Sequence, residues 1–408
     1  MMPVSSQKKV RQITTPMADR PLGLYIHWPF CLAKCPYCDF NSHVASSVDT
    51  DQFGDALCDE MTHMAALLPK PKPLTSVFFG GGTPSLMPPD LVARLIEHAK
   101  RLFGFASSVE ITAEANPTSV EADAMLAFRR SGVNRVSMGV QALDDTVLRF
   151  LGREHSASQA LAALETVKSA FENMSVDLIY ATPGQSASHW RSTLDTALGL
   201  GLSHLSLYQL TIEEGTVFFT RQRRGEIMTA DDDHAAYLYE LTQDITAMAG
   251  LPAYEVSNHA MLGAECAHNL IYWQGGDWLG IGPGAHGRFT IYDQKTAAFA
   301  RISSQTRRSP AGWRDAIAKY GHAIETKTQE SAIDWASEML MMGLRLHQGV
   351  NLAAIESLCG RRHTWLDQAN LDRAIDEGWL RYDAGAEQLS ATAAGMVRLN
   401  SVLSLILR

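Results

Sequence analysis

The sequence predicts an α/β protein: a partial (β/α)6 TIM-like barrel, then an α+β region, then a C-terminal winged-helix-like domain. Short apolar runs rich in β-formers alternate with helical patterns through the first half of the 408 residues. This alternation is typical of a parallel sheet with helices outside it. Ligand-binding residue types follow the runs, where barrels of this kind carry their chemistry. After about residue 215 the alternation stops.

Six strand–helix units account for the expected barrel. The expected strands are Leu22–His27, Ser76–Phe79, Val109–Glu114, Arg135–Val140, Val176–Tyr180 and His204–Leu210. The expected helices are Asp51–Leu68, Pro89–Phe103, Val120–Ser131, Asp144–Leu151 with Ser158–Phe171, and Ser188–Leu200. Beyond the barrel, Asp231–Met248 is expected to form a long helix, because it opens with an acidic first turn.

Changes in composition divide the chain into five segments. We expect a disordered leader at 1–20, the barrel at 21–215, an α+β extension at 216–302, a polar linker at 303–311 and the winged-helix-like domain at 312–408. A winged helix binds DNA in some proteins and serves as a packing module in others. The acidic balance of this chain favours the packing role.

The charge and the cysteine usage exclude several classes of protein. A net charge of -9 and a pI near 5.9 argue against nucleic-acid binding. The six cysteines are unevenly spaced, which does not suit a disulfide framework and is typical of a reducing compartment. No apolar run is long enough to span a membrane, and no signal peptide is evident. We therefore expect a cytoplasmic protein.

The most informative motif is a trio of cysteines, Cys31, Cys35 and Cys38, with C-x3-C-x2-C spacing. Four thiolates would complete the ligation of a cubane iron–sulfur cluster, whereas three leave one iron open. That iron can be chelated by the amine and carboxylate of a small molecule. The alternative is a zinc site with His43 as the fourth ligand. A zinc knuckle would not need the motifs that follow, so iron is favoured.

Further polar and glycine motifs follow the ends of the expected strands. The run Gly80–Pro84 allows a close approach of the backbone, because glycine has no Cβ. Carboxylates can bind hydroxyls or an ammonium, and an arginine can hold a carboxylate with two hydrogen bonds. Structural ion pairs are the alternative for each charged residue. The strand-end residues that we expect to converge on one barrel mouth are Glu114, Gln141, Arg153 and Asp177.

Four of these motifs together resemble the oxygen-independent coproporphyrinogen III oxidase family of radical S-adenosylmethionine (SAM) proteins, over about residues 21–400. They are Tyr25-x-His27-x-Pro29-Phe30-Cys31, Gly80–Pro84, Ser137-x-Gly139-x-Gln141 and Asp177–Tyr180. The resemblance implies a radical SAM barrel with a [4Fe–4S] cluster on the three cysteines. The SAM contacts that it implies are Tyr25, Tyr37, Gly81, Gly82, Thr83, Glu114, Gln141, Arg153 and Asp177.

Two departures point to a branch of that family. The oxidase motif continues to a fourth cysteine, where this chain has Phe40, and only 24 residues precede Tyr25. Both departures are similar to those of the haem-chaperone branch. The run His268-Asn269-x-x-Tyr272-Trp273 also resembles the HNxxYW motif of that branch, which implies that these residues handle haem.

A haem site needs an iron ligand and apolar cover for the macrocycle. His268 is the natural axial ligand, with Tyr272 and Trp273 packing on the porphyrin. Cys266 and His286 are alternative ligands, and the bland alternative is that His268 only packs in a glycine-rich loop. A methionine-rich stretch over 339–342 is better explained as a helical core stripe. No C-x-x-C-H motif indicates covalent attachment.

The resemblance implies a haem chaperone that passes haem to acceptors such as respiratory cytochromes, with a cluster that drives homodimer formation or gates transfer. It leaves open whether the protein is an enzyme. The first alternative function is radical SAM oxidative decarboxylation of coproporphyrinogen III to protoporphyrinogen IX. The second is a DNA-binding sensor with an iron–sulfur switch, which the acidic charge disfavours.

Overall fold

The computed structural model describes residues 20–70, 72–293 and 298–408, so nearly all of the expected leader at 1–20 lies outside the described residues. The described residues form an 11-stranded sheet in the order β13-β12-β11-β10-β1-β4-β5-β6-β7-β8-β9. Six parallel neighbours form its middle. They are β1 (Leu22–Trp28), β4 (Leu74–Gly81), β5 (Phe105–Ala115), β6 (Arg135–Gln141), β7 (Asn173–Tyr180) and β8 (His204–Gln209).

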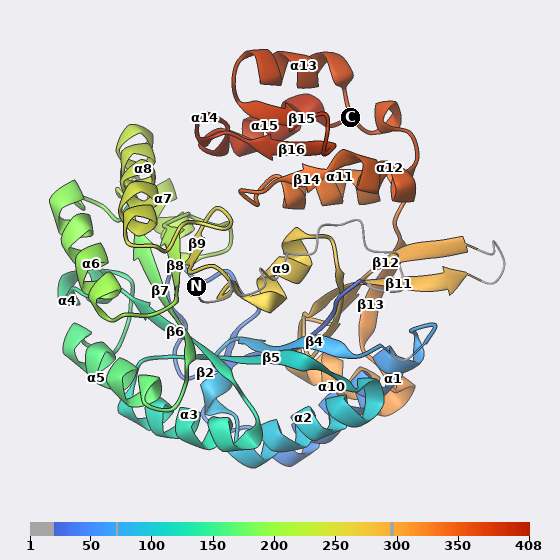
Figure 1. Cartoon of the computed structure of the whole chain (residues 1–408). Coiled ribbons are helices and arrows are strands. Elements are labelled where there is room, and N and C mark those ends of the chain that lie inside the picture. The colour runs from blue at the N-terminus through green and yellow to red at the C-terminus, as the bar shows by residue number, and fades with distance from the viewer. Residues whose placement is uncertain (1–19, 71, 294–297) are drawn as a thin grey trace, which may run out of the picture.

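Helices connect these strands in the order that the sequence predicts, which confirms the β/α alternation. They are α1 (Thr50–Ala66), α2 (Pro89–Phe103), α3 (Ser119–Ser131), α4 (Asp145–Phe150), α5 (Ala157–Lys168) and α6 (Ala187–Gly199). Figure 1 shows them in an arc around the outer face of the curved sheet. Local sequence fixes their ends: α5 begins with a capping box, in which Ser156 and Gln159 satisfy each other's backbone N–H groups.

The sheet continues past both ends of the predicted barrel. Beside β1 lie β10 (Asp277–Ile281), which is parallel to it, and then three antiparallel strands, β11 (His286–Asp293), β12 (Ala298–Thr306) and β13 (Ile324–Gln329). Beside β8 lies the short antiparallel β9 (Asn258–Ala260). The linker expected at 303–311 is therefore wrong, because this segment holds the end of β12 and the start of α10 (Pro310–Tyr320).

A buried carboxyl joins the added strands to the barrel. Glu60 on α1 is fully buried and accepts hydrogen bonds from the N–H of Gly282 at 2.8 Å, the indole of Trp313 at 2.8 Å and the N–H of Ala323 at 3.0 Å. Burial raises the pKa of Glu60 to about 7. These three donors come from the β10–β11 turn, α10 and the start of the β13 segment, so one side chain ties α1 to the extension.

Three helices of the region after β8 complete the main body: α7 (Val217–Arg223), α8 (Asp232–Met248) and α9 (Ala267–Trp273). Figure 1 shows α9 on the inner side of the curved sheet, away from the outer arc of helices. It contacts β1, β4 and β10, and its far side contacts the C-terminal unit. This helix carries the HNxxYW motif, so the motif lies in the middle of the molecule.

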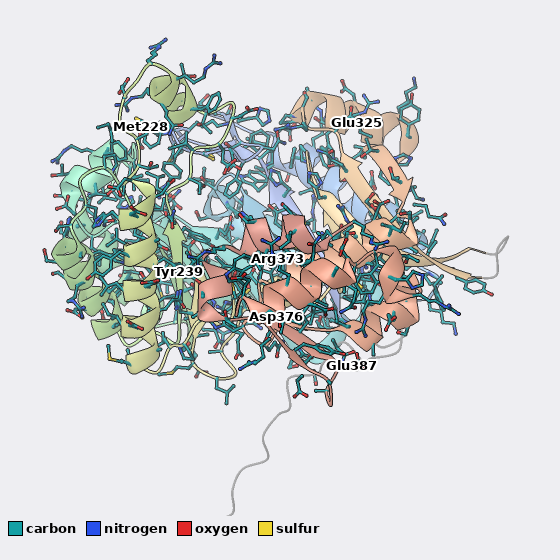
Figure 2. All side chains as sticks on the ribbon, turned by 90° about the horizontal axis from the view of Figure 1, so that it is seen from above. Met228, Tyr239, Glu325, Arg373, Asp376 and Glu387 are labelled. Atoms are coloured by element: carbon teal, nitrogen blue, oxygen red, sulfur yellow. The ribbon has the colours of Figure 1, made fainter. Side chains whose placement is uncertain are left out.

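The C-terminal unit has a winged-helix-like order with a core of its own around Trp365. A three-stranded sheet, ordered β14-β16-β15, lies beside helices α11 to α13. Figure 2, seen from above, shows this unit (Arg373, Asp376 and Glu387) beside Tyr239 of α8, with Glu325 of β13 farther up in the view. Its elements are α11 (Ala332–Gly343), β14 (Val350–Asn351), α12 (Leu352–Cys359), α13 (Gln368–Asp376), β15 (Leu380–Asp383), β16 (Gln388–Ala391), α14 (Ala393–Met396) and α15 (Leu399–Ile406).

In residues 20–70, 72–293 and 298–408, none of the helices combines the length and the apolar character needed to cross a bilayer.

Candidate functional site

The cysteine loop follows β1 and is closed at its base by two short parallel strands, β2 (Phe30–Cys31) and β3 (His43–Val44). Cys31 is buried, whereas Cys35 and Cys38 are half-buried, and all three thiols are free. The N–H of Cys38 donates to the carbonyl of Cys35 at 3.1 Å, which turns the loop back on itself. The three cysteines line one cavity of about 160 Å³.

The cysteine arrangement suits a cluster better than a single metal ion. In the described part of the chain, no three His, Cys, Asp or Glu side chains gather around one ion position. The zinc alternative with His43 needs such a gathering. A cubane takes each thiolate on a different iron, so its ligands line a cavity instead of meeting at a point. The residues present therefore fit a cluster held by three cysteines.

The same cavity gathers most of the residues that the resemblance assigns to SAM. Eight of the nine line it: Tyr37, Gly81, Gly82, Thr83, Glu114, Gln141, Arg153 and Asp177. They come from the cysteine loop, from the ends of β4, β5 and β6, from β7 and from the turn after α4. The ninth, Tyr25, lies on β1 and lines two neighbouring cavities.

The glycines at the end of β4 have a packing role that the sequence did not reveal. A Cβ on Gly81 would lie 2.6 Å from the ring of His27, and one on Gly82 would lie 2.6 Å from the carbonyl oxygen of Phe30. The N–H groups of Gly82 and Thr83 donate to Trp28 and Phe30 at 2.7 and 2.9 Å. The glycine run therefore holds the cysteine loop against β4, because only a residue without a side chain permits this approach.

Two half-buried carboxyls, Glu114 and Asp177, face the cavity from β5 and β7. Burial, and then the charge of Asp177, raises the pKa of Glu114 to about 8. Burial raises the pKa of Asp177 to about 6, although Ser137 donates to it at 3.0 Å. The N–H of Gly81 donates to Glu114 at 3.2 Å. Carboxyls of this kind are stabilised in their charged form by a cation, and SAM carries an ammonium and a sulfonium.

Arg153 and Gln141 complete the wall opposite the glycines. Arg153 lies 3.5 Å from the sulfur of Cys35 and donates to Asn116 at 2.5 Å and to the carbonyl of Gly139 at 2.8 Å. Its Nε is buried without an acceptor among the described residues. Gln141 has a φ of +69°, which is uncommon for a residue with a side chain and occurs often at ligand sites.

Tyr37 packs against Phe218 of α7, with ring centroids 6.3 Å apart. Burial raises its pKa. The resemblance assigns Tyr37 to SAM, and its place in the cavity wall is compatible with that assignment. The sequence reasoning missed Asn116, which also lines the cavity and accepts from Arg153. Its position two residues after Glu114, at the same strand end, was the available signal.

The HNxxYW motif on α9 lies against the inner face of the sheet. His268 is buried, and both of its ring nitrogens are hydrogen-bonded, Nδ1 with the hydroxyl of Ser76 and Nε2 with that of Tyr272, each at 2.7 Å. Burial lowers the pKa of His268 to about 3. Its ring also stacks on Phe78 at 5.1 Å. An iron ligand needs a free ring nitrogen, so this geometry suits the packing alternative.

The rest of the motif is also engaged. Tyr272 packs edge-on against Trp278 at 4.6 Å, and burial raises its pKa. Trp273 is half-buried, and its indole nitrogen has no acceptor within the described ranges. Cys266, the first alternative ligand, is buried with its thiol 3.4 Å from Glu110. Burial, and then the charge of Glu110, raises the pKa of this thiol to about 12.

Comparisons with known proteins agree with this architecture. Residues 25–197 match the Radical SAM superfamily, and residues 331–397 match the HemN C-terminal domain. The structure of coproporphyrinogen III oxidase (HemN) from Escherichia coli superposes with a TM-score of 0.77, covering 95% of this chain and 90% of the oxidase. At 23% identity this likeness establishes the fold alone.

Sequence relatives are similar over most of their length. The mitochondrial radical S-adenosyl methionine domain-containing protein 1 of Mus musculus is 40% identical over 82% of this chain and 75% of its own. The haem chaperone HemW of Escherichia coli is 36% identical over 95% of this chain and 98% of its own. With the three-cysteine loop and the barrel, these similarities show that the chain belongs to the HemW family of radical SAM proteins.

Proposed function

We propose that this protein is a haem chaperone, which binds haem and passes it to acceptor haem proteins such as respiratory cytochromes. The observation that carries the proposal is the similarity to bacterial HemW over 95% of the chain. The cysteine loop supports it, because Phe40 stands where the oxidase motif has a fourth cysteine.

Cys31, Cys35 and Cys38 hold a [4Fe–4S] cluster in this proposal, and SAM binds its open iron through its amine and carboxylate. Such a cluster supplies one-electron chemistry when it is bound. Glu114 and Asp177 lie where the positive charges of SAM would stabilise their charged forms and lower both raised pKa values. Arg153 lies beside Cys35, where its charge offsets that of the thiolate.

Titration of haem into the purified protein tests the proposal, with the Soret band as the readout. We expect saturable binding of about one haem per chain, followed by loss of haem from the protein when an apo-cytochrome is added. Absence of saturable binding would remove the chaperone function.

Oxidative decarboxylation of coproporphyrinogen III is the second candidate, because the chain shares its fold with HemN and could hold a cluster and SAM. Phe40, which stands in place of the fourth cysteine of the oxidase motif, argues against it. An anaerobic assay with dithionite, SAM and coproporphyrinogen III decides between the two. Formation of protoporphyrinogen IX by the reconstituted protein would favour the enzyme.

We further propose a cytoplasmic protein whose homodimer depends on the cluster. Leu32 and Val44 flank the cluster ligand Cys31 in the loop and are 64% and 62% exposed, which leaves apolar surface that a second copy would cover. Sedimentation of cluster-loaded and cluster-free protein tests the dimer, and cell fractionation tests the compartment. No role in nucleic-acid binding is proposed, since the net charge is -9.

A further inference from the structure

A second and larger cavity adjoins the cysteine cavity. Its volume is about 520 Å³, within the range of roughly 300–1,000 Å³ of pockets that hold cofactors and other small molecules. It lies between the cysteine loop, the β10–β11 hairpin and α11 of the C-terminal unit. The two cavities share Phe40, Gly81 and Glu114 in their walls. A molecule in the larger cavity would therefore lie beside the cluster.

The histidines at this cavity differ in whether a ring nitrogen is free. His27 lines the cavity, but its Nδ1 pairs with the hydroxyl of Tyr25 at 3.1 Å and its Nε2 with the carbonyl of Asn41 at 2.9 Å. His268 stands behind Tyr272 with both nitrogens engaged. His286 lines the cavity, is exposed, and has no hydrogen bond to its ring from any described residue. It is the histidine that can bind iron without losing a bond.

The backbone of His286 is held rigidly. It begins β11 and pairs with Gln305 of β12, and its carbonyl accepts from the indole of Trp278 at 3.1 Å. Gly280 permits the tight hairpin, because a Cβ there would lie 2.1 Å from the same carbonyl oxygen. Partial burial, and then the charges of two nearby arginines, lowers the pKa of His286.

Other lining residues match the remaining parts of a haem. Met342 reaches the cavity from α11 and is half-buried, unlike Met339 of the same helix, which lies in the domain core. Phe40, which is 61% exposed, and Trp278 offer aromatic surface for a macrocycle. Arg308 lines the rim, and its guanidinium forms no ion pair with the described residues.

We propose that this cavity binds haem, with His286 as an axial iron ligand, the thioether of Met342 as the ligand from the opposite unit, and Arg308 paired with a propionate. The inference rests on the proposed haem-chaperone function and assigns its site. A histidine–methionine pair is an established form of haem ligation. Arginine suits a carboxylate because it can donate two parallel hydrogen bonds. Haem in this position would lie next to Phe40, the residue that separates it from the cluster cavity.

The test compares ferric haem binding by the wild-type protein, His286→Ala, Met342→Leu and His363→Ala, a control at an exposed histidine outside the cavity. Loss of a residue that only hydrogen-bonds a metal ligand already weakens metal binding by about 10–100-fold, so loss of the direct ligand His286 should raise the Kd for haem at least about tenfold. We expect its absorption spectrum to change as well, and added imidazole to restore it. His363→Ala should match the wild-type protein.

Met342→Leu preserves apolar volume, so it should fold and should change the spectrum of reduced haem. If His286→Ala does not fold, an unchanged spectrum in Met342→Leu overturns the assignment. Wild-type affinity and spectrum in a folded His286→Ala protein also overturn it, although the chaperone proposal then stands. If the wild-type protein itself binds no haem, the proposed function fails and this site fails with it.

Discussion

Gly81→Ala is the substitution for which the structure allows the most quantitative prediction. Gly81 has a φ of +117°, and an added Cβ would lie 2.6 Å from the ring of His27. That ring cannot swing away freely, because both nitrogens are hydrogen-bonded and the side chain is buried. We expect a backbone cost of about 1–2 kcal/mol from the positive φ. Forcing the ring to move adds about 1–3 kcal/mol.

Gly132→Ala is the matched control. Gly132 has a similar φ, +110°, but its added Cβ would meet only the side chain of Ile96, at an ordinary contact distance of 3.7 Å. The backbone cost is therefore similar in the two variants, and the difference between them isolates the contact with His27. We expect Gly81→Ala to lower the free energy of unfolding by about 1–3 kcal/mol more than the control does. Urea denaturation of the cluster-free proteins, followed by circular dichroism, measures this difference.

The same variant should bind SAM more weakly after cluster reconstitution, because His27 and Gly81 position the cysteine loop. Equal stability losses in Gly81→Ala and Gly132→Ala would refute the argument that the glycine run is required for packing of the loop. The only remaining explanation for the glycine run would then be that it lets the backbone approach a bound ligand closely.

Three further predictions concern the cluster, a half-buried carboxyl and the cavity wall. Each of the substitutions Cys31→Ser, Cys35→Ser and Cys38→Ser should abolish the ~400 nm absorbance of the reconstituted protein. Cys58→Ser on α1 should retain this absorbance. A colourless Cys58→Ser protein would contradict the proposed set of cluster ligands. Burial raises the folded-state pKa of Glu114 from 4.5 to about 8, so the folded protein retains this proton and loses stability as the pH rises through that window. Between pH 5 and pH 8, Glu114→Gln should therefore lose less free energy of unfolding than the wild-type protein, and the difference should be a few kcal/mol at most. Urea titrations at each pH measure it. Glu165→Gln, on an exposed helix face, should follow the wild-type curve. Arg153→Lys should raise the Kd for SAM about tenfold or more, because lysine cannot replace the planar guanidinium that contacts Asn116 and Gly139. Calorimetric titration measures this Kd, and an unchanged affinity would place Arg153 outside the binding site.

The barrel could be predicted because its signals are local and repeated. Each of the first five apolar runs is followed by a helical pattern, and this alternation predicts a parallel sheet with helices outside it. The extension could not be predicted in the same way. In β12, Ser304 and Thr306 face inward although they are polar, and Thr306 is satisfied by hydrogen bonds to Gly282 and Ala285. Buried polar residues hide the period of a strand, and this is why the segment was expected to be a linker.

The convergence of the strand-end residues on one cavity could be predicted, because strand-end residues of a parallel sheet meet at one edge whatever the details of packing. The residues that the resemblance assigns to haem were harder to place. The sequence motif places aromatic residues near His268 in the chain. It does not show that the hydroxyl of Ser76, almost 200 positions earlier, forms a hydrogen bond with one nitrogen of the His268 ring. His286 was one of several alternatives, and its free ring became apparent only from the hairpin that presents it. Long-range hydrogen bonds decide such cases, and spacing alone does not contain them.

Anaerobic reconstitution followed by iron and sulfide analysis and electron paramagnetic resonance tests the central claim most directly. We predict about four irons and four sulfides per chain, as expected for a cubane, and a reduced-cluster spectrum that changes when SAM is added. Such a change requires an iron that no cysteine occupies. Iron-free protein, or a cluster whose spectrum is indifferent to SAM, would contradict the account.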